Sequence, residues 1–414
     1  MRVLHLVGGS IESGAGKGAL WLHLAQLESG IDSTLVTNSE IGEKYKKLKV
    51  FNICSRLGAY FFEFNKRVLN YLPLKFYKRR NKTIFSSGLD GVNFLDLDCY
   101  KNADIIHLHW INGLVSTRLL KKINKPIVWT LRDMWPFTGG CHISMGCTRY
   151  ENSCGSCPQL GSTSKYDFSR IIYKSKIRYY PSDIVIVGIS KWIANCAKES
   201  SIFSHNRIEV ISNNVNTDLF YPLDKNIARS KLKLNESLKI ILLGAEVVGE
   251  PWKGFSLFVE SLQFLEKSNL HFVFFGKVSS KEIEKLGISY SILGRINSIE
   301  ELSVIYSAAD VFVAPSIYDS FGKTIVEAMA CQTLVVCFDA TGPKDIVEHK
   351  KTGYKALPYS SHDLSNGINW VLNLKPNEYF DLALYSRSRA ITLYDSKIIA
   401  NRYKQLYRNI LSNN

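Results

Sequence analysis

Residues 311–339 read VFVAPSIYDSFGKTIVEAMACQTLVVCFD, and this stretch decides the fold of the chain. An apolar run ends at Pro315-Ser316, a helical pattern opens near Gly322, and a second apolar run begins at Leu334. This order predicts a strand, a loop, a helix and a strand, which together form the crossover unit of a buried parallel sheet.

Two carboxylates of this stretch are candidates for ligand binding. Asp319 is expected in the loop at the carboxyl end of the first strand, where open α/β sheets bind ligands. Glu327 is expected in the first turns of the helix, beside backbone N–H groups that favour anions. Taken alone, the pair also fits ordinary solvated or capping residues.

The pattern Pro-Ser-x-x-Asp-x-Phe-Gly-x-x-x-x-Glu-Ala-Met-Ala, which starts at Pro315, resembles the Glu-x7-Glu signature of glycosyltransferase family 4. Enzymes of this family have the two-domain GT-B fold. The resemblance implies that Asp319 contacts the donor sugar and that Glu327 holds the nucleotide ribose. Because Asp319 stands where the family has Glu, its carboxylate reaches about 1.5 Å less far. The resemblance also implies donor contacts from the residues between the two acids, namely Ser320, Phe321, Gly322, Lys323 and Thr324.

The size and charge of the chain limit its class. Its 414 residues favour two to three domains, and its net charge of +15 indicates acidic partners such as nucleic acid, anionic lipid or phosphorylated substrate. No apolar run reaches the roughly 18 residues of a membrane span, and the chain opens on a strand-like run, not a signal peptide. We therefore expect a cytoplasmic protein. Nine cysteines in such a chain argue for thiols or a metal site over a disulfide framework.

A basic and aromatic segment occupies residues 43–83, where Lys and Arg alternate with Phe and Tyr and only Glu43 and Glu63 oppose them. Such segments suit an anionic membrane surface, at about 1 kcal/mol for each basic residue near it. Residues 44–82 are therefore predicted to bind the inner face of the cell membrane, with a solvated helical pair as the alternative. No nucleic-acid recognition motif accompanies the segment, so we expect no nucleic-acid partner.

A glycine-rich loop at residues 8–18 separates a predicted strand at 3–7 from a helical pattern at 19–27. Glycines let backbone N–H groups approach an anion closely, and the family resemblance implies that Gly9 lies near the donor phosphates. The loop matches neither a P-loop nor a dinucleotide fingerprint, so a flexible turn is the alternative.

Two more predicted strands, at residues 103–110 and 126–135, end in polar side chains. His107 and His109 share one face of the first strand. His109 and Asp133 are expected to meet in one cleft and are candidate catalytic residues, with a buried structural role as the alternative for His109. Relatives carry Thr-Leu-His-Asp where residues 130–133 of this chain read Thr-Leu-Arg-Asp. The role of the relatives' histidine therefore does not transfer to Arg132. Arg132 is a candidate for a phosphate contact instead.

Four cysteines lie within seventeen residues, inside an insertion at 139–160: Cys141, Cys147, Cys154 and Cys157. The Cys-x2-Cys half resembles a zinc knuckle, although the other half has a looser spacing than usual. We predict a structural zinc site, with free thiols or one disulfide as the alternative. The flanking Trp-Pro-Phe-Thr-Gly-Gly-Cys-His and Cys-Pro-Gln-Leu resemble a subset of family 4 associated with capsule and exopolysaccharide synthesis.

A second series of strands and helices begins at residues 239–244, and Lys253 stands at the start of its first helical pattern. The Lys-Gly pair matches the phosphate-binding lysine of the family, and one charge-assisted hydrogen bond contributes about 1.5–3 kcal/mol. Relatives often have arginine at the position of Ala245, which leaves Arg295 and Lys277 as candidates for a second positive charge. Arg295 also stands where relatives receive the nucleotide base.

The predicted fold class is α/β of the GT-B type, with two doubly wound Rossmann-like domains facing across a cleft. The expected acceptor-binding domain covers residues 1–222 and the nucleotide-sugar-binding domain covers 223–392. A helix at 393–414 is expected to return to the N-terminal domain.

The predicted function is that of a retaining hexosyltransferase in surface polysaccharide biosynthesis. It would move a sugar from a nucleotide-diphosphate sugar donor to a glycan or polyprenyl-diphosphate-linked acceptor; retention is implied by the resemblance alone. Lys253 supplies charge neutralisation and no Asp-x-Asp pair follows a predicted strand, so no cofactor is expected for catalysis. The rivals are a catalytically inactive GT-B partner subunit and another GT-B chemistry, such as a nucleotide-sugar epimerase or a phosphorylase.

Overall fold

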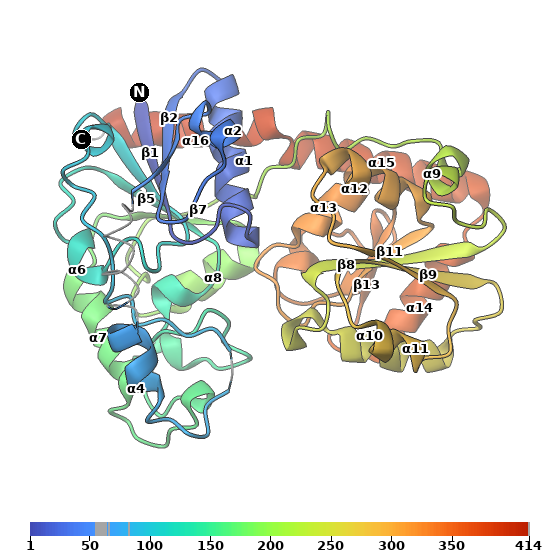
Figure 1. Ribbon diagram of the computed structural model, residues 1–414, viewed down its shortest axis with the longest axis horizontal. Coiled ribbons are helices and arrows are strands. Elements are labelled where there is room, and N and C mark those ends of the chain that lie inside the picture. The colour runs from blue at the N-terminus through green and yellow to red at the C-terminus, as the bar shows by residue number, and fades with distance from the viewer. Residues whose placement is uncertain (54–63, 65–66, 82, 413–414) are drawn as a thin grey trace. The chain divides into compact units, whose positions relative to one another are not determined.

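The computed structural model describes residues 1–53, 64, 67–81 and 83–412. The chain divides into two compact units (Figure 1). Unit 1 comprises Met1–Ser212 and Ile399–Asn414, and unit 2 comprises Asn213–Ile398. Each unit is built on one parallel β-sheet, so the predicted fold class of two doubly wound Rossmann-like domains is confirmed.

Unit 1 has a seven-stranded sheet in the order β3-β2-β1-β4-β5-β6-β7. Strands β4, β5 and β6 are buried along their whole length, as expected of parallel strands covered on both faces. In the register between β1 and β4, His5 lies beside His107. The strands are β1 Arg2–Val7, β2 Asp32–Thr37, β3 Val50–Asn52, β4 Ile105–Leu108, β5 Ile127–Leu131, β6 Val185–Gly188 and β7 Ile208–Val210.

The first helix of unit 1 begins earlier than the predicted residue 19. The Ser13 hydroxyl accepts a hydrogen bond from the Gly16 N–H and caps α1 (Gly14–Glu28). A Cβ at Gly16 would come within 2.2 Å of the Ser10 carbonyl oxygen, so glycine lets this helix pack tightly on the loop before it. Much of the glycine-rich loop is therefore the first turn of a helix.

The remaining helices of unit 1 are mostly short. The longer ones cover the sheet and the short ones connect its strands. They are α2 Glu43–Lys46, η1 Arg67–Tyr71, α4 Leu72–Leu74, α5 Asp98–Lys101, α6 Thr117–Leu120, η2 Trp135–Phe137, η3 Arg149–Glu151, η4 Pro158–Leu160, α7 Phe168–Tyr179, α8 Lys191–Glu199 and α16 Ser396–Ser412.

Unit 2 has a six-stranded parallel sheet in the order β10-β9-β8-β11-β12-β13, with helices on both faces (Figure 1). The strand, loop, helix and strand predicted for residues 311–339 are present as β11, α13 and β12. The strands are β8 Lys239–Val247, β9 Leu270–Lys277, β10 Tyr290–Gly294, β11 Val311–Ala314, β12 Val335–Phe338 and β13 Gly353–Ala356. The helices are α9 Lys225–Lys231, η5 Pro251–Lys253, α10 Phe255–Ser261, η6 Leu262–Phe264, α11 Ser280–Glu284, α12 Ile299–Ala308, α13 Lys323–Ala330, η7 Gly342–Asp345, α14 Ser361–Leu372 and α15 Pro376–Tyr394.

The structure divides the chain after residues 212 and 398, whereas the sequence suggested 222 and 392. Residues 213–222 belong to unit 2 because they pack on the end of α15: the Thr217 hydroxyl donates to Asp395 at 2.7 Å, and Arg387 donates to the Phe220 carbonyl. Residues 399–412 belong to unit 1, where Tyr403 and Tyr407 of α16 are buried against the sheet.

None of the described helices combines the length and the apolar character that crossing a lipid bilayer requires.

Candidate active site

A short turn after β8 presents Lys253 to the loop that follows β11. Gly254 has φ +69°, and a Cβ there would come within 1.8 Å of the Pro315 carbonyl oxygen. The Trp252 carbonyl accepts hydrogen bonds from the N–H groups of Ile317 at 2.9 Å and Tyr318 at 3.1 Å. Only glycine allows this close approach, so Gly254 sets the distance between the two loops.

Lys253 and Asp319 form an ion pair in unit 2. The Lys253 Nζ lies 2.8 Å from Asp319 Oδ2, and Asp319 Oδ1 accepts the Phe321 N–H at 3.1 Å. Burial acts to raise the pKa of Asp319, but the Lys253 ammonium, together with the backbone N–H groups of Phe321 and Gly322, outweighs it and holds this pKa below its ordinary value. The structure therefore brings together the candidate phosphate-binding lysine and the candidate sugar-positioning carboxylate.

Glu327 lies in α13 with only 4% of its surface exposed. Its Oε2 accepts a hydrogen bond from the buried Tyr306 hydroxyl of α12 at 2.8 Å. Burial, followed by the Glu327 carboxylate, raises the pKa of Tyr306 well above its ordinary value, so the phenol keeps its proton and donates. Sequence reasoning missed Tyr306, which lies on the buried face of α12.

The other donor-site candidates of unit 2 have different environments. Gly322, with φ +100°, caps α13, and the buried Phe321 packs edge-on against Tyr394. The side chains of Ser320, Lys323 and Thr324 are partly exposed. Arg295 is exposed just after β10, and no contact among the described residues links it to the Lys253–Asp319 pair.

In unit 1, Gly9 has φ +72° and its peptide is held within the protein. The Gly9 N–H donates to Asn38 Oδ1 at 2.7 Å, and the Gly9 carbonyl accepts from the Thr37 hydroxyl at 2.9 Å. The N–H of Gly9 is thus already used by Asn38 in this structure.

His109 lies in a buried histidine cluster together with His5 and His107, and all three side chains are less than 2% exposed. Its Nε2 lies 2.9 Å from His5 Nδ1, and its Nδ1 lies 3.2 Å from Arg132 Nη2. His107 lies 2.6 Å from the Tyr407 hydroxyl of α16 and 2.7 Å from the Thr130 hydroxyl.

Burial lowers the pKa of His5 to about 3, with the His23 ring adding to the effect. It also lowers the pKa values of His107 and His109 well below their ordinary values. The cluster is therefore neutral at pH 7 and cannot supply a general acid. The structure places His109 inside unit 1, where it contacts Arg132.

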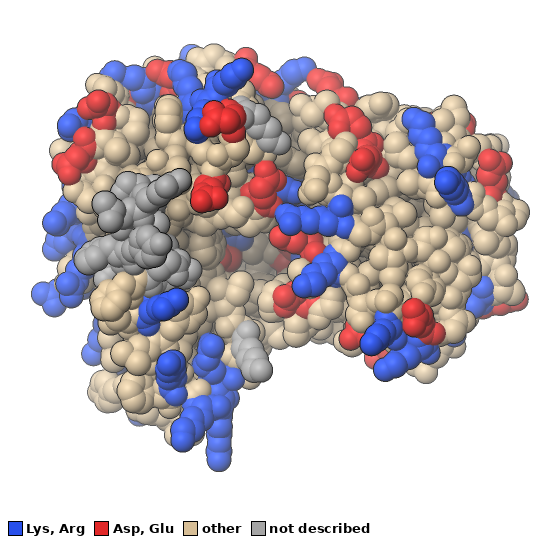
Figure 2. Space-filling model, viewed as in Figure 1, with Lys and Arg blue, Asp and Glu red and all other residues tan. Residues whose placement is uncertain are grey.

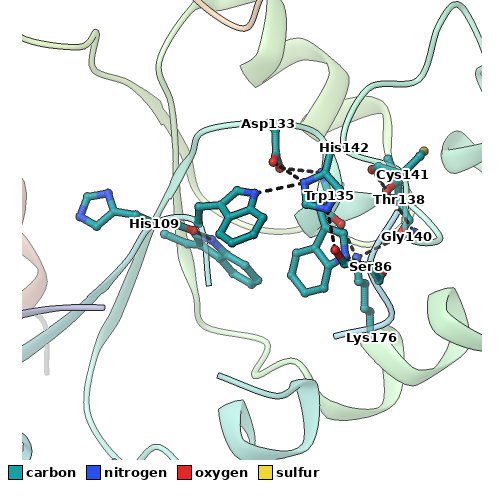
Figure 3. A network of polar contacts seen from close by, with 11 residues as sticks. Ser86, His109, Asp133, Trp135, Thr138, Gly140, Cys141, His142 and Lys176 are labelled. Carbon is teal, nitrogen blue, oxygen red and sulfur yellow. Dashed lines mark hydrogen bonds and ion pairs between the residues drawn. The ribbon is translucent and has the colours of Figure 1, made fainter. Parts of the chain in front are cut away.

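Asp133 belongs to the polar network that Figure 3 shows, in which His109 is also drawn. Its Oδ2 accepts from Nδ1 of His142 at 2.6 Å, and its Oδ1 accepts the Trp135 N–H at 2.9 Å. His142 Nε2 lies 2.9 Å from the Ser86 hydroxyl, and Trp110 Nε1 lies 3.1 Å from His142 Nδ1. The side chain of Asp133 is 17% exposed and that of His142 is 4% exposed.

The network holds the Asp133 carboxylate by both oxygens while leaving part of it accessible. Such a carboxylate can accept a proton or a hydrogen bond from a bound hydroxyl group. Sequence reasoning named Asp133 but missed His142, nine residues further on; its place directly after the two glycines and Cys141 was the available signal. The side chains of His109 and Asp133, which were expected to meet, have different hydrogen-bond partners: the His109 ring contacts Arg132, and the Asp133 carboxylate contacts His142.

Comparisons with known proteins agree on the class of this chain. Residues 224–389 match the family described as Glycosyl transferases group 1. An uncharacterised glycosyltransferase of Methanocaldococcus jannaschii is 24% identical over 300 residues, which cover 68% of this chain and 68% of that protein. The N,N'-diacetylbacillosaminyl-diphospho-undecaprenol alpha-1,3-N-acetylgalactosaminyltransferase of Campylobacter jejuni is 29% identical over 220 residues, which cover 50% of this chain and 56% of that enzyme.

Among solved structures, Anabaena HepE in complex with UDP and glucose has the same fold. It has a TM-score of 0.66 at 16% identity, over 99% of this chain and 100% of that one. The matched family range lies within unit 2 and contains the Lys253–Asp319 pair and Glu327. The chain is therefore a glycosyltransferase, with a Glycosyl transferases group 1 domain in its second unit.

Proposed function

We propose that this protein is a retaining glycosyltransferase that moves a sugar from a nucleoside-diphosphate sugar to a lipid-linked glycan acceptor. The observation that carries the proposal is the Lys253–Asp319 ion pair, which is 2.8 Å long and in which Asp319 lies on the same crossover unit as Glu327. Two polar functions of a nucleotide-sugar site, a cation for the diphosphate and carboxylates for hydroxyl groups, thus come from neighbouring strand ends of one sheet.

Each residue has a defined part in this mechanism. The Lys253 ammonium moves from Asp319 to the departing diphosphate and stabilises the charge that develops there. The released Asp319 carboxylate then accepts hydrogen bonds from the donor sugar. Glu327, held by the Tyr306 hydroxyl, accepts hydrogen bonds from the ribose. Arg295 contributes a second positive charge near the base. No metal is required, because lysine already neutralises the leaving group.

The acceptor side is proposed for unit 1, with the Asp133–His142 pair receiving the acceptor hydroxyl group. The relative from Campylobacter is named for a diphospho-undecaprenol-linked acceptor, which supports an acceptor of this class. The segment from Trp135 to His142 resembles enzymes of capsule and exopolysaccharide synthesis, so we place the protein in surface polysaccharide synthesis on the cytoplasmic side of the cell membrane.

A screen of nucleotide sugars tests this function. The matching donor should raise the melting temperature, because a ligand that binds the folded state stabilises it. Free nucleoside diphosphate should then appear only when an acceptor is added. Conversion of the donor to another nucleotide sugar without release of diphosphate would instead identify an epimerase. A failure of every donor to stabilise the protein would favour an inactive partner subunit.

Membrane attachment is proposed for the described part of residues 44–82. Phe76 is 81% exposed and Phe64 is 63% exposed, and Lys75, Lys78 and Arg79 are exposed beside Phe76. Figure 2 shows Lys and Arg gathered over the part of unit 1 where Figure 1 labels α4. Several residues of the predicted segment lie outside the described residues, including Arg56, Tyr60, Phe61, Phe62, Lys66 and Lys82.

Reversing the charge of Lys75, Lys78 and Arg79 to Glu should weaken binding to phosphatidylglycerol vesicles on the order of 100-fold, because each basic residue contributes about 1 kcal/mol at an anionic surface. Cosedimentation with vesicles measures this loss. The control reverses three exposed lysines of unit 2, Lys231, Lys281 and Lys285, with the same change in net charge. Equal losses in both triple variants would show that only the net charge matters and would reject this patch.

A further inference from the structure

The four cysteines of the insertion surround one small cavity in unit 1. Cys141, Cys147, Cys154 and Cys157 all line a space of about 20 Å³, which is room for a single ion or water molecule. All four are free thiols. They come from three separate parts of the insertion, so no local turn explains why four thiols face the same space.

Backbone groups point at two of the sulfur atoms. The Gly139 N–H donates to Cys154 Sγ at 3.2 Å, and the N–H groups of Gln159 and Leu160 face the Cys157 sulfur. The turn between these cysteines uses positive φ angles at Cys154, Gly155 and Ser156. N–H donors of this kind stabilise a thiolate that is bound to a metal, because they orient the ligand and offset its negative charge.

Cationic side chains stand around the cavity. The Lys176 ammonium, which is fully buried, donates to the carbonyl groups of Trp135 and Thr138 and faces Cys141 and Cys154. Arg149 donates to the Gly155 carbonyl at 3.0 Å, and Arg170 donates to the Cys154 carbonyl at 3.0 Å. Four thiolates around a divalent ion carry a net charge of −2, and the Arg149 and Arg170 guanidinium groups would offset it.

A histidine set elsewhere in unit 1 is the rival metal site. Among the described residues, the three ligand atoms that all lie within 4.8 Å of one another belong to His5, His107 and His109. Both nitrogens of each of these rings already have a protein partner, and the Arg132 guanidinium lies 3.2 Å from His109. A cation there would break these hydrogen bonds and would be repelled by the Arg132 guanidinium, so we assign no metal site to these histidines.

We propose that Cys141, Cys147, Cys154 and Cys157 bind one structural Zn²⁺ ion. Four sulfur ligands select zinc or an iron–sulfur cluster, and the cavity is too small for a cluster. In a tetrahedral site with Zn–S bonds of about 2.3 Å, the sulfur atoms lie about 3.8 Å apart. No three of these four sulfur atoms all lie within 4.8 Å of one another in this structure, so binding of the ion requires the thiols to move toward one another.

The ion would also stabilise the conformation of the candidate acceptor site. Cys141 directly precedes His142 (Figure 3). The His142 carbonyl accepts the Met134 N–H at 3.1 Å. Fixing Cys141 therefore fixes the imidazole that holds Asp133. This second role rests on the proposed function, whereas zinc binding itself does not.

Metal analysis of the full-length protein, purified under reducing conditions from zinc-supplemented cells, tests the proposal. We expect one zinc per chain, and Co²⁺ in its place should give the thiolate-to-cobalt absorption of a tetrahedral sulfur site. Cys154→Ser and Cys157→Ser should lose the zinc, while Cys99→Ser, a thiol of unit 1 outside the cavity, should keep it.

A second measurement avoids the risk that the serine variants fail to fold. Titration of the unaltered protein with a mercurial reagent should release zinc in step with the modification of these four thiols, as identified by mass spectrometry. Zinc that is absent from the unaltered protein, a disulfide among the four cysteines, iron in place of zinc, or zinc retained in both serine variants would each overturn the proposal. If the unaltered protein contains zinc but transfers no sugar, only the proposed function is contradicted, and the zinc site stands.

Discussion

Replacing Lys253 by alanine is expected to lower the rate of sugar transfer about 10²–10³-fold, because the departing diphosphate loses the group that stabilises its charge. The effect on stability should be small, since the Lys253–Asp319 pair is partly exposed and such pairs contribute about 0–1 kcal/mol. Steady-state kinetics with the donor found by screening, together with urea denaturation, separates the two effects. Lys253→Arg should recover part of the rate, because it keeps the positive charge.

Unit 2 offers a matched control for this change. Lys225 forms an ion pair with Asp310 at 2.9 Å, and this lysine has no place in the proposed mechanism. Lys225→Ala removes a comparable lysine–aspartate pair and should leave the rate of transfer unchanged. Equal rates for Lys253→Ala and the unaltered enzyme would remove Lys253 from the mechanism, and with it the main support for the proposed donor site.

Gly254→Ala is expected to destabilise unit 2 by about 2–4 kcal/mol and to weaken donor binding. The new Cβ would come within 1.8 Å of the Pro315 carbonyl oxygen, so the turn that carries Lys253 has to move away from the loop that carries Asp319. Urea denaturation measures the loss of stability. The dissociation constant of the donor measures how much binding is lost when the Lys253 ammonium is displaced.

The control for this variant is Gly287→Ala. Gly287 has φ +60°, close to that of Gly254, but a Cβ there meets nothing within 4 Å. It should therefore cost only the left-handed backbone penalty of about 1–2 kcal/mol. If both variants lose the same stability, backbone conformation alone accounts for the effect and the contact with Pro315 has no role.

Several features of the candidate site could be predicted from the sequence because they depend on local order. Lys253 and Asp319 follow the carboxyl ends of β8 and β11, which are neighbours in the sheet, so their side chains meet. The alternation of side chains along a strand placed His107 and His109 on one face, and their rings lie 4.2 Å apart.

Other features could not be predicted, because they join elements that are distant in the sequence. His142 holds Asp133 through a loop that leaves the sheet and returns, and Tyr306 reaches Glu327 from a different helix. His107 bonds to Tyr407, 300 residues away, so only the packing of α16 on the sheet shows that this end of β4 is interior.

Apolar periodicity and the order of strands and helices thus determined the class of fold and the crossover unit, and the resemblance to family 4 named the candidate donor-site residues in unit 2. These properties follow from which residues bury their side chains and from the right-handed, parallel connection of strands. Tertiary structure alone decided which polar groups pair. The same holds for the four cysteines that line one cavity. In both cases side chains from separate segments meet in the interior, where water is excluded and each buried polar group needs a partner.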